Sequence, residues 1–346
     1  MRRPNSQTLI LIGAIVFVVY LAGIPLLMLL YGSIRSAPIG EPGATYTIQN
    51  YVRAYFDREF YLLFLNSLYF AIGTCALTCL IGTFLAWVSE RTNTPFKKVF
   101  VVMALVPFII PGILSTISWI LLLSPKIGLI NLTLKNVLGL ESAPFNVYSM
   151  WGMIWAEAIH DYPLVFLLMS AALRNMDTSL EEAALTAGSS TWTTFKRITL
   201  PLMRPALFSV LLIVFIRGVE AFEVPALIGV PAKISVFTTK IFLAIHQFPS
   251  DFGLAGSYAV TLLVISTAGV LIYGKITRRE ERYATVTGKG YRPRVIDLGK
   301  WKYLTCALSF FIFFLAVILP VFVLLVLVHS VLRRTVARAH GQNDLG

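Results

Sequence analysis

The sequence predicts an all-α membrane protein, and three observations support this fold class. Of its 346 residues, 57% are apolar and 13% are charged, whereas a soluble domain carries roughly 25% charged residues. The mean hydropathy is +0.77, and several uncharged runs reach the length of about 20 residues that a helix needs to cross a bilayer. The net charge is +12, but the basic residues are dispersed between apolar runs, which does not favour a nucleic-acid-binding face.

Seven apolar segments have the length of a membrane span. In the first, the apolar part from Leu9 to Leu30 exceeds the core of a cleaved secretory signal, so we predict a signal-anchor helix that is retained. The segments at 147–173 and 205–228 contain charged residues but remain long enough to span. In chain order the predicted spans are 4–34, 61–89, 99–123, 147–173, 205–228, 252–274 and 303–328.

Charge and composition of the connections predict which side of the membrane each one faces. Eighteen of the 29 Lys and Arg residues lie in the N-terminus and in the connections after the second, fourth and sixth spans. Positive charge accumulates on the cytoplasmic side, so the N-terminus is predicted to be cytoplasmic. The outer stretch "YTIQNYVRAYF" is too polar to span and aromatic enough for the interface, which predicts a surface helix or cap.

Three prolines lie inside predicted spans. Pro107 and Pro111 fall in the third span and Pro163 in the fourth. Proline frees a backbone carbonyl and permits a kink where neighbours satisfy it. Bent helices suit a transport pathway, although they also occur in static bundles.

The inner connection between the fourth and fifth spans, residues 174–205, predicts a helix, a turn and a second helix. Thr178 and Glu181 have the spacing of a capping box that begins a helix near Ser179, and Gly188 is suited to end it. One face of this helix is small and apolar, and Glu181 and Glu182 are expected to be exposed near its N-terminus. The residues of the apolar face are Leu180, Ala183, Ala184 and Ala187.

A second short helix is predicted to follow the turn. Ser189, Ser190 or Thr191 is suited to cap it, and Pro201 is expected to stop it. Its apolar side chains are Trp192, Phe195 and Ile198. Periodicity alone leaves open whether this hairpin only braces the bundle or has a partner.

This connection resembles the signature of binding-protein-dependent ABC transporter permeases, E-A-A-x3-G-x9-I-x-L-P. Every signature position is present, and the motif lies before the fifth span on the predicted cytoplasmic side. The matching residues are Glu182, Ala183, Ala184, Gly188, Ile198, Leu200 and Pro201. The resemblance implies a six-helix ABC permease bundle plus one extra C-terminal transmembrane helix, with these residues coupled to a separate ATP-hydrolysing subunit.

The resemblance also implies the partners and the domain organisation. The expected partners are an ABC ATPase subunit dimer, a periplasmic or extracellular solute-binding protein, a second permease half and membrane lipid, without nucleic acid. The location implied is the bacterial inner membrane. The expected divisions are an anchor and outer segment (1–60), a permease core (61–274) with its coupling loop (174–204), a basic cytoplasmic linker (275–302) and a seventh span with tail (303–346).

The chain itself is predicted not to be an enzyme. It contains no G-x-x-x-x-G-K-[ST] motif; Gly288-Lys289-Gly290 lacks the hydroxyl residue that would hold magnesium. No H-E-x-x-H or G-x-S-x-G motif is present either. We therefore expect this chain to bind no cofactor and the partner subunit to use ATP.

The resemblance is closest to permeases of ferric-iron uptake systems and covers roughly residues 51–301. The stretches that suggest iron are "EAFEVPALIGVP" at 220–231 and "RYATVTGKGYRPRVIDLGKW" at 282–301. Related permeases for sulfate, polyamines, phosphonates and thiamine share much of this pattern, so these substrates remain alternatives. The resemblance implies import by alternating access.

Charged residues inside the spans are candidates for the translocation path, because each costs a few kcal/mol in the bilayer and normally faces an interior cavity. The candidates are Glu157, Asp161, Arg217, Glu220 and Glu223. Spacing allows Arg217 to pair with Glu220 as a structural ion pair. Alternatively, the carboxylates offer oxygen to a hard cation; no metal site is predicted firmly, and His160 is expected to be a hydrogen-bonded core histidine.

The seventh span is one more than the six expected for a permease half. Ferric-type permeases are often two fused halves, and residues 303–328 resemble the first span of a second half. The sequence therefore suggests a truncated fused permease. The alternatives are a proton-coupled secondary transporter, with the buried charges as its relay, and, less favoured, a membrane-embedded enzyme, for which the spans lack a catalytic set.

Overall fold

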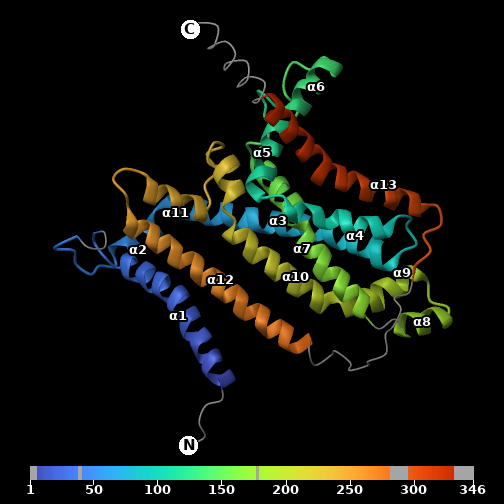
Figure 1. The fold of residues 1–346 in the computed structure, drawn as a ribbon, viewed down its shortest axis with the longest axis horizontal. Helices are drawn as coiled ribbons and strands as arrows, with labels where there is room; N and C mark the ends of the chain where they lie inside the picture. Colours follow the sequence, from blue (N-terminus) through green and yellow to red (C-terminus); the bar gives the residue numbers. More distant parts are fainter. Residues whose placement is uncertain (1–5, 38–40, 177–178, 281–294, 331–346) are drawn as a thin grey trace, which may run out of the picture. The chain divides into compact units, whose positions relative to one another are not determined.

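The computed structural model describes residues 6–37, 41–176, 179–280 and 295–330 (Figure 1). Over these residues the chain is helical, with two isolated β-bridges and no longer strand. It divides into two compact units, residues 1–67 with 235–267 and residues 68–234 with 268–346. The predicted all-α membrane fold is confirmed.

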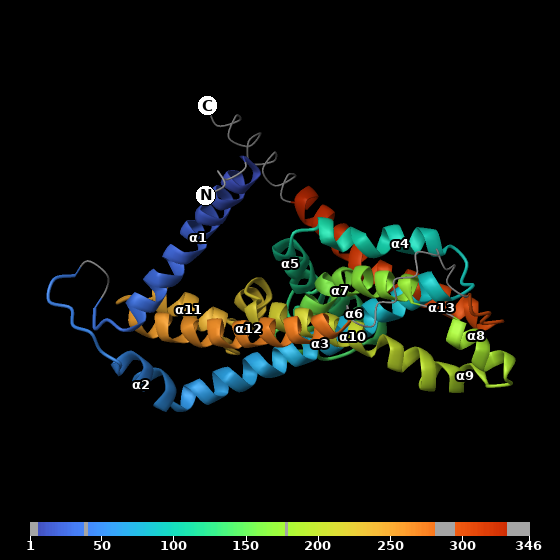
Figure 2. The same ribbon diagram turned by 90° about the horizontal axis from the view of Figure 1, so that it is seen from below.

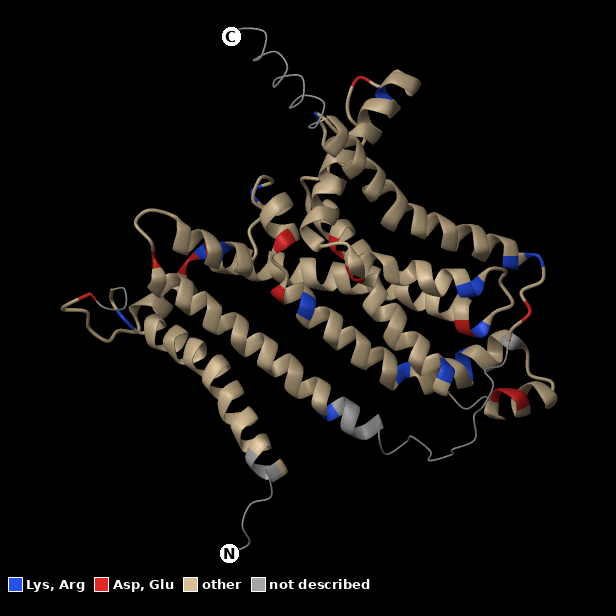
Figure 3. Ribbon diagram, in the orientation of Figure 1, with Lys and Arg blue, Asp and Glu red and all other residues tan. Residues whose placement is uncertain are grey.

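Six helical segments of the described chain are long and apolar enough to cross a membrane, and a bent pair of helices adds a seventh. Charged residues are sparse along the middle of these helices and more frequent near their ends (Figure 3). The helices of the six segments are α1 (Ser6–Ser33), α3 (Arg58–Arg91), α7 (Met150–Asn175), α10 (Leu200–Glu220), α12 (Phe252–Glu280) and α13 (Trp301–Phe313), which continues through η4 (Phe314–Ile318).

The bent pair is the predicted third span. It consists of α4 (Lys97–Leu105), a tight 3₁₀ turn η1 (Val106–Ile109) and α5 (Gly112–Leu123), and its halves meet at 96° (Figure 2). Pro107 and Pro111 remove two backbone donors, and Ile110 before Pro111 adopts the extended conformation that a following proline favours. The predicted kink is confirmed and is sharper than a bend within one helix. Pro163, in contrast, lies inside a continuous α7.

The unit of residues 1–67 and 235–267 holds α1, α2 (Gln49–Phe56), α11 (Phe237–His246) and the first turns of α3 and α12. The surface helix predicted for the outer segment is α2. Its Asn50 amide donates to the carbonyls of Ser33 (3.0 Å) and Arg35 (2.7 Å). Its Ala54 joins a small core, which also contains Leu63, Phe237 and Tyr258.

In the other unit α7 is the most buried span, packed against α10, α5 and η1. The remaining elements here are α6 (Leu129–Leu138), α8 (Ser179–Thr186), α9 (Thr191–Thr194), η2 (Phe195–Thr199) and η3 (Pro225–Gly229). α13 packs against α4, where the rings of Phe100 and Phe310 meet edge to face at 4.9 Å.

The predicted bounds of the fifth span are wrong at both ends. Instead of 205–228, the spanning helical segment runs from Trp192 to Glu220. The chain leaves the helix at Ala221, so that Glu223 lies between α10 and η3. The apolar composition of 224–230 suggested a continuing span, but these residues form the separate wide turn η3.

Candidate functional site

The inner connection folds as a helix, a turn and a second helix, as predicted. α8 begins at Ser179, as expected from the capping box, although Thr178 lies outside the described residues. Gly188 ends the first helix with a positive φ of 87°. Its N–H donates to the Leu185 carbonyl and the Ser189 N–H to the Ala184 carbonyl, both at 3.0 Å. This is the Schellman arrangement, in which a glycine relieves the strain of the left-handed position.

The second helix begins as predicted but does not end as predicted. Ser190 caps it, since its hydroxyl oxygen accepts from the Thr193 N–H at 3.2 Å. Pro201 does not stop it: the helical segment continues from α9 through η2 into α10. In the wide turn of η2 the Leu200 N–H bonds to the Phe195 carbonyl five residues earlier. The change from four-residue to five-residue hydrogen bonding makes room for the Pro201 ring, and the helix continues although Pro201 has no N–H to donate.

The two acidic residues at the start of α8 have different surroundings. Glu182 is exposed, as predicted, whereas Glu181 is buried, which corrects the expectation that both are exposed. Glu181 pairs with Arg91 of α3 and accepts a hydrogen bond from Thr199. The apolar surface of the hairpin stays accessible: Leu180 is 54% and Trp192 70% exposed, and the Trp192 ring stacks on Phe195.

The candidate pathway residues are brought together, as the clustering of charges in spans four and five suggests. A pocket of about 290 Å³ opens between α7, the end of α10, the start of α5 and the loop before η3. Among its lining residues are Glu157, Arg217, Glu220 and Glu223. Asp161 does not line the pocket; it is buried one helical turn from Glu157 on α7 and pairs with Arg217.

Arg217 pairs with Asp161 and not with Glu220, which corrects the predicted partner. Its Nε and Nη2 atoms donate to the two carboxylate oxygens of Asp161 at 3.1 and 2.9 Å. This two-pronged geometry is the strong form of an arginine–carboxylate pair. The close packing of α10 on α7 brings a fixed carboxylate to Arg217, whereas Glu220, one turn along the same helix, remains exposed in the pocket.

The bend of the third span contributes to the same pocket. Gly112, the first residue of α5, lies against the Glu223 carboxylate, and a β-carbon there would also approach His160 Nε2 to 3.3 Å. Glycine therefore lets a carboxylate reach the N-terminus of α5, where the helix dipole favours negative charge. Sequence reasoning missed Gly112; its position directly after Pro111 at a predicted kink was the available signal.

His160 is not the fully hydrogen-bonded core histidine that was expected. Its buried Nδ1 has no hydrogen-bond partner among the described residues, while the ring lines the pocket. Over the described part of the chain, no group of three or more His, Cys, Asp and Glu side chains is arranged to hold a metal ion. The pocket thus has an acidic lining, but its residues are not arranged as the coordination sphere of a metal ion.

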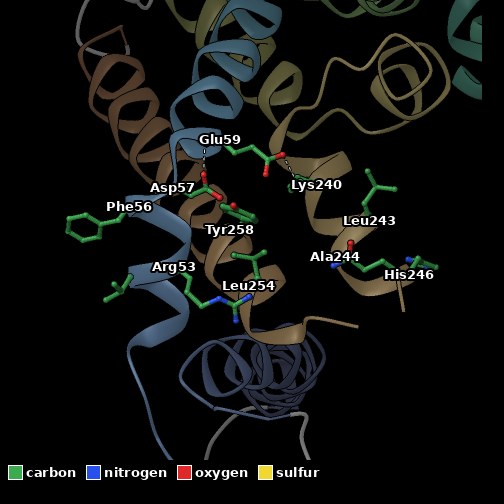
Figure 4. Close-up of a pocket in the computed structure, with 12 residues that line it drawn as sticks. Arg53, Phe56, Asp57, Glu59, Lys240, Leu243, Ala244, His246, Leu254 and Tyr258 are labelled. Carbon is green, nitrogen blue, oxygen red and sulfur yellow. Dashed lines mark hydrogen bonds and ion pairs between the residues drawn. The ribbon is translucent and has the colours of Figure 1, made fainter. Parts of the chain in front are cut away.

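A second and larger pocket, of about 710 Å³, lies in the unit of residues 1–67 and 235–267 (Figure 4). It opens where α3 and α12 begin, between α2 and α11. Lys240 of α11 pairs with Glu59 of α3 at 2.5 Å, and Arg53 of α2 with Asp251 at 2.7 Å. Tyr258 lines the pocket from α12. The lining thus combines apolar side chains with charged ones, several of them ion-paired.

The comparisons with known proteins agree with this architecture. The "Putative ferric transport system permease protein FbpB 1" of Haemophilus influenzae is 27% identical over 74% of this chain, but the chain spans only 40% of that relative's length. The "Molybdenum transport system permease protein ModB" of the same species is 30% identical, with 53% of this chain and 76% of the relative covered.

A solved structure shares the fold. The bacterial alginate ABC transporter, crystallised in complex with an alginate pentasaccharide-bound periplasmic protein, matches with a TM-score of 0.62 at 19% identity, covering 82% of this chain and 95% of that chain. The family model described as "Binding-protein-dependent transport system inner membrane component" matches residues 78–282. With that match over more than half its length, the chain belongs to the family of inner membrane components of binding-protein-dependent transport systems.

Proposed function

We propose that this protein is the permease subunit of a binding-protein-dependent ABC importer in the bacterial inner membrane, with its N-terminus in the cytoplasm. Substrate crosses by alternating access of the spans, driven by ATP hydrolysis on a separate subunit, while this chain binds no cofactor itself. Family membership supports the transport role. The exposed hairpin between α7 and α10 supports a partner that pushes on the spans.

The hairpin is the proposed docking surface for the ATPase subunit. Leu180 and Trp192 expose large apolar side chains on two consecutive short helices, which a water-facing surface does not favour without a partner. The Schellman turn at Gly188 fixes the angle between these helices. The residues assigned to this coupling surface are Glu182, Ala183, Ala184, Gly188, Ile198, Leu200 and Pro201.

Co-purification tests the coupling surface. Tagged protein is extracted from its own cells in mild detergent as wild type, Glu182→Arg and Gly188→Trp, with Val137→Arg as the control because Val137 is 74% exposed on α6, away from the hairpin. An ATPase subunit should accompany wild type and the control and be lost from both hairpin variants. Equal recovery in all four would contradict the assignment, and transport that persists without any ATPase subunit would favour a proton-coupled transporter.

Ferric iron is the proposed substrate, and the observation that carries this choice is the charge of the 290 Å³ pocket. Three carboxylates line it, those of Glu157, Glu220 and Glu223, and the charge of its one lining guanidinium, Arg217, is already balanced by Asp161. A surplus of oxygen ligands attracts a hard cation and repels oxyanions such as sulfate and molybdate. The ferric name of one relative agrees with this charge, and the molybdenum name of another does not.

Uptake measurements test the substrate. The chain is reconstituted with its co-purifying partners, and uptake of radiolabelled ferric iron, sulfate and molybdate is compared for wild type and Glu220→Gln/Glu223→Gln. Iron uptake should exceed anion uptake and should fall in the double variant by at least about fivefold, the effect of losing roughly 1 kcal/mol of attraction. A rise in anion uptake when the carboxylates are removed would support selection by the charge of the pocket. Anion uptake by the wild type would contradict ferric iron as the substrate.

Three further partners complete the proposal, namely a solute-binding protein, a second permease half and membrane lipid. A solute-binding protein docks at the 710 Å³ pocket between α2 and α11, whose paired charges and apolar lining suit a transient interface. A second permease half completes the pathway, and lipid covers the remaining apolar spans. The periplasmic protein bound to the alginate transporter supports the first of these partners.

A further inference from the structure

The buried partner of Glu181 is an arginine at the far end of a different span. Arg91 is the last residue of α3, and its side chain is only 1% exposed, while that of Glu181 is 5% exposed. One carboxylate oxygen of Glu181 accepts from Arg91, and the other accepts from the Thr199 hydroxyl at 2.6 Å. A single carboxylate on α8 is therefore held both by the end of α3 and by the turn that leads into α10.

Burial makes this pair different from the ion pair beside it. Glu90, the preceding residue, pairs with Arg174 at 2.7 Å, but the Arg174 side chain is 61% exposed. An exposed pair is screened by water and orders little. A buried guanidinium and a buried carboxylate each depend on the other, because either charge alone would be stranded in a medium of low dielectric. Arg91 and Glu181 cannot separate without water entering.

The main chain at Arg91 is hydrogen-bonded to a third part of the chain, the segment around Ile296 that precedes α13. Its carbonyl accepts from the Ile296 N–H at 2.7 Å, and the Asn93 N–H donates to the Ile296 carbonyl at 3.1 Å, forming a short parallel bridge. Nearby, the hydroxyls of Thr94 and Thr305 are 2.8 Å apart. The end of α3 thus contacts α8 through the Arg91 side chain and the segment before α13 through its backbone, and the residues just after it contact α13 through the Thr94 and Thr305 hydroxyls.

We propose that Arg91 is a positioning residue that fastens α8 to the ends of α3 and α10, so that a force on the exposed face of α8 moves these spans together. The family signature includes Glu182, but Glu181 is the acidic residue that points into the protein. The fastening itself is a property of this chain, and its role in transmitting force rests on the function proposed above.

Hydrogen–deuterium exchange of the purified full-length protein tests the fastening without any partner. The variants are Arg91→Met, which keeps an unbranched side chain of similar length without charge, and Arg174→Gln, which breaks the neighbouring exposed pair as the matched control. Exchange across residues 179–186 should accelerate at least about tenfold in Arg91→Met and less than about twofold in the control, since hydrogen bonds to buried charges limit local opening. Equal exchange in the two variants would overturn the proposal.

A milder variant covers the case in which Arg91→Met does not accumulate in membranes. Thr199→Val removes one hydrogen bond to Glu181 and no charge, so the chain should fold. It should raise exchange in α8 about threefold, in line with the loss of a single buried hydrogen bond. Unchanged exchange in Thr199→Val would contradict the fastening.

Transmission is tested separately, with the ATPase subunit present. Substrate-stimulated ATP hydrolysis should fall at least about fivefold in Arg91→Met, the lower end of typical coupling between sites, and stay unchanged in Arg174→Gln. Normal stimulation despite a loosened α8 would refute transmission through Arg91. If no ATPase subunit joins even the wild type, the proposed function fails, while the exchange result still decides the fastening.

Discussion

Two arginine–carboxylate pairs in this protein have the same chemistry but opposite surroundings. Arg91 and Glu181 are both buried, with side chains 1% and 5% exposed. In the pair of Arg217 with Asp161 the Asp161 side chain is 3% exposed, but the Arg217 side chain is 47% exposed and lines a pocket. The first pair closes a contact between helices, and the second leaves one partner accessible.

The surroundings of each pair indicate what it can do. Both carboxylate oxygens of Glu181 already accept hydrogen bonds from the protein, and neither Glu181 nor Arg91 lines one of the two pockets described above. Around Arg217 the pocket holds three more carboxylates than the pair needs, namely Glu157, Glu220 and Glu223. A closed charge pair specifies geometry, whereas a surplus of charge beside a cavity attracts an ion. Substitutions in the two pairs test this distinction and have the largest expected effects, and two smaller changes probe the pocket and the contact between Asn93 and Asp297.

Arg91→Met should have the largest effect on stability. It strands the buried Glu181 carboxylate, so the free energy of unfolding should fall by about 3–5 kcal/mol. Equilibrium unfolding in mixed detergent micelles, followed by tryptophan fluorescence, measures this loss. Arg174→Gln breaks an exposed pair and should cost less than about 1 kcal/mol. Similar losses in the two variants would show that burial does not distinguish these pairs.

Arg217→Met should lower the free energy of unfolding by a smaller amount, about 1–3 kcal/mol. It leaves Asp161 without its cation, but this site is open to water on the Arg217 side. Removing both charges in Arg217→Met/Asp161→Asn should restore most of the stability, since the double variant strands no charge. The same unfolding measurement checks both. A double variant less stable than the single one would mean that the pair does more than neutralise Asp161.

Gly112→Ala should change transport more than stability. A β-carbon at Gly112 displaces the Glu223 carboxylate from the N-terminus of α5, which removes a favourable dipole interaction and should lower substrate uptake about two- to fivefold. The free energy of unfolding should stay within about 1 kcal/mol of wild type, because Glu223 is an exposed and flexible side chain. Gly274→Ala is the control, with no atom within 4 Å of the added carbon; an equal loss of uptake there would exclude a specific role for Gly112.

Acidification should have the smallest effect, confined to the contact of Asp297 with Asn93 and Gly299 just before α13. The Gly299 N–H and the Asn93 amide donate to the carboxylate of Asp297 and lower its pKa below the ordinary value of 3.8. The folded state therefore favours the charged form, so this contribution is complete above pH 3.8 and is lost as the pH falls through the lowered pKa. The amide exchange rate of residues 295–300, corrected for the intrinsic effect of pH on exchange, measures this contribution. It should increase in that acidic range in wild type and should not change with pH in Asp297→Asn. A wild-type profile as flat as that of the variant would contradict the lowered pKa.

Local features of the chain were largely readable from the sequence. Long apolar runs, two of them interrupted by charged residues, located all seven apolar segments. Gly188 marked the turn of the inner hairpin, and Pro107 and Pro111 marked the bend in the third span. These features depend on hydrophobic length and on backbone conformations that a few neighbouring residues determine. The end of the fifth span was misplaced because an apolar stretch supports a wide turn as well as a span.

The partners of charged residues could not be read from the sequence. Spacing suggested that Arg217 meets Glu220 three residues away, yet its partner is Asp161, 56 residues earlier. Helical position suggested two exposed acids on α8, yet Glu181 is buried against Arg91, 90 residues away. Periodicity is a property of a few consecutive residues and so was determined by the sequence alone. Which charge is buried depends on which helices pack together, and for that reason only the tertiary structure decided it.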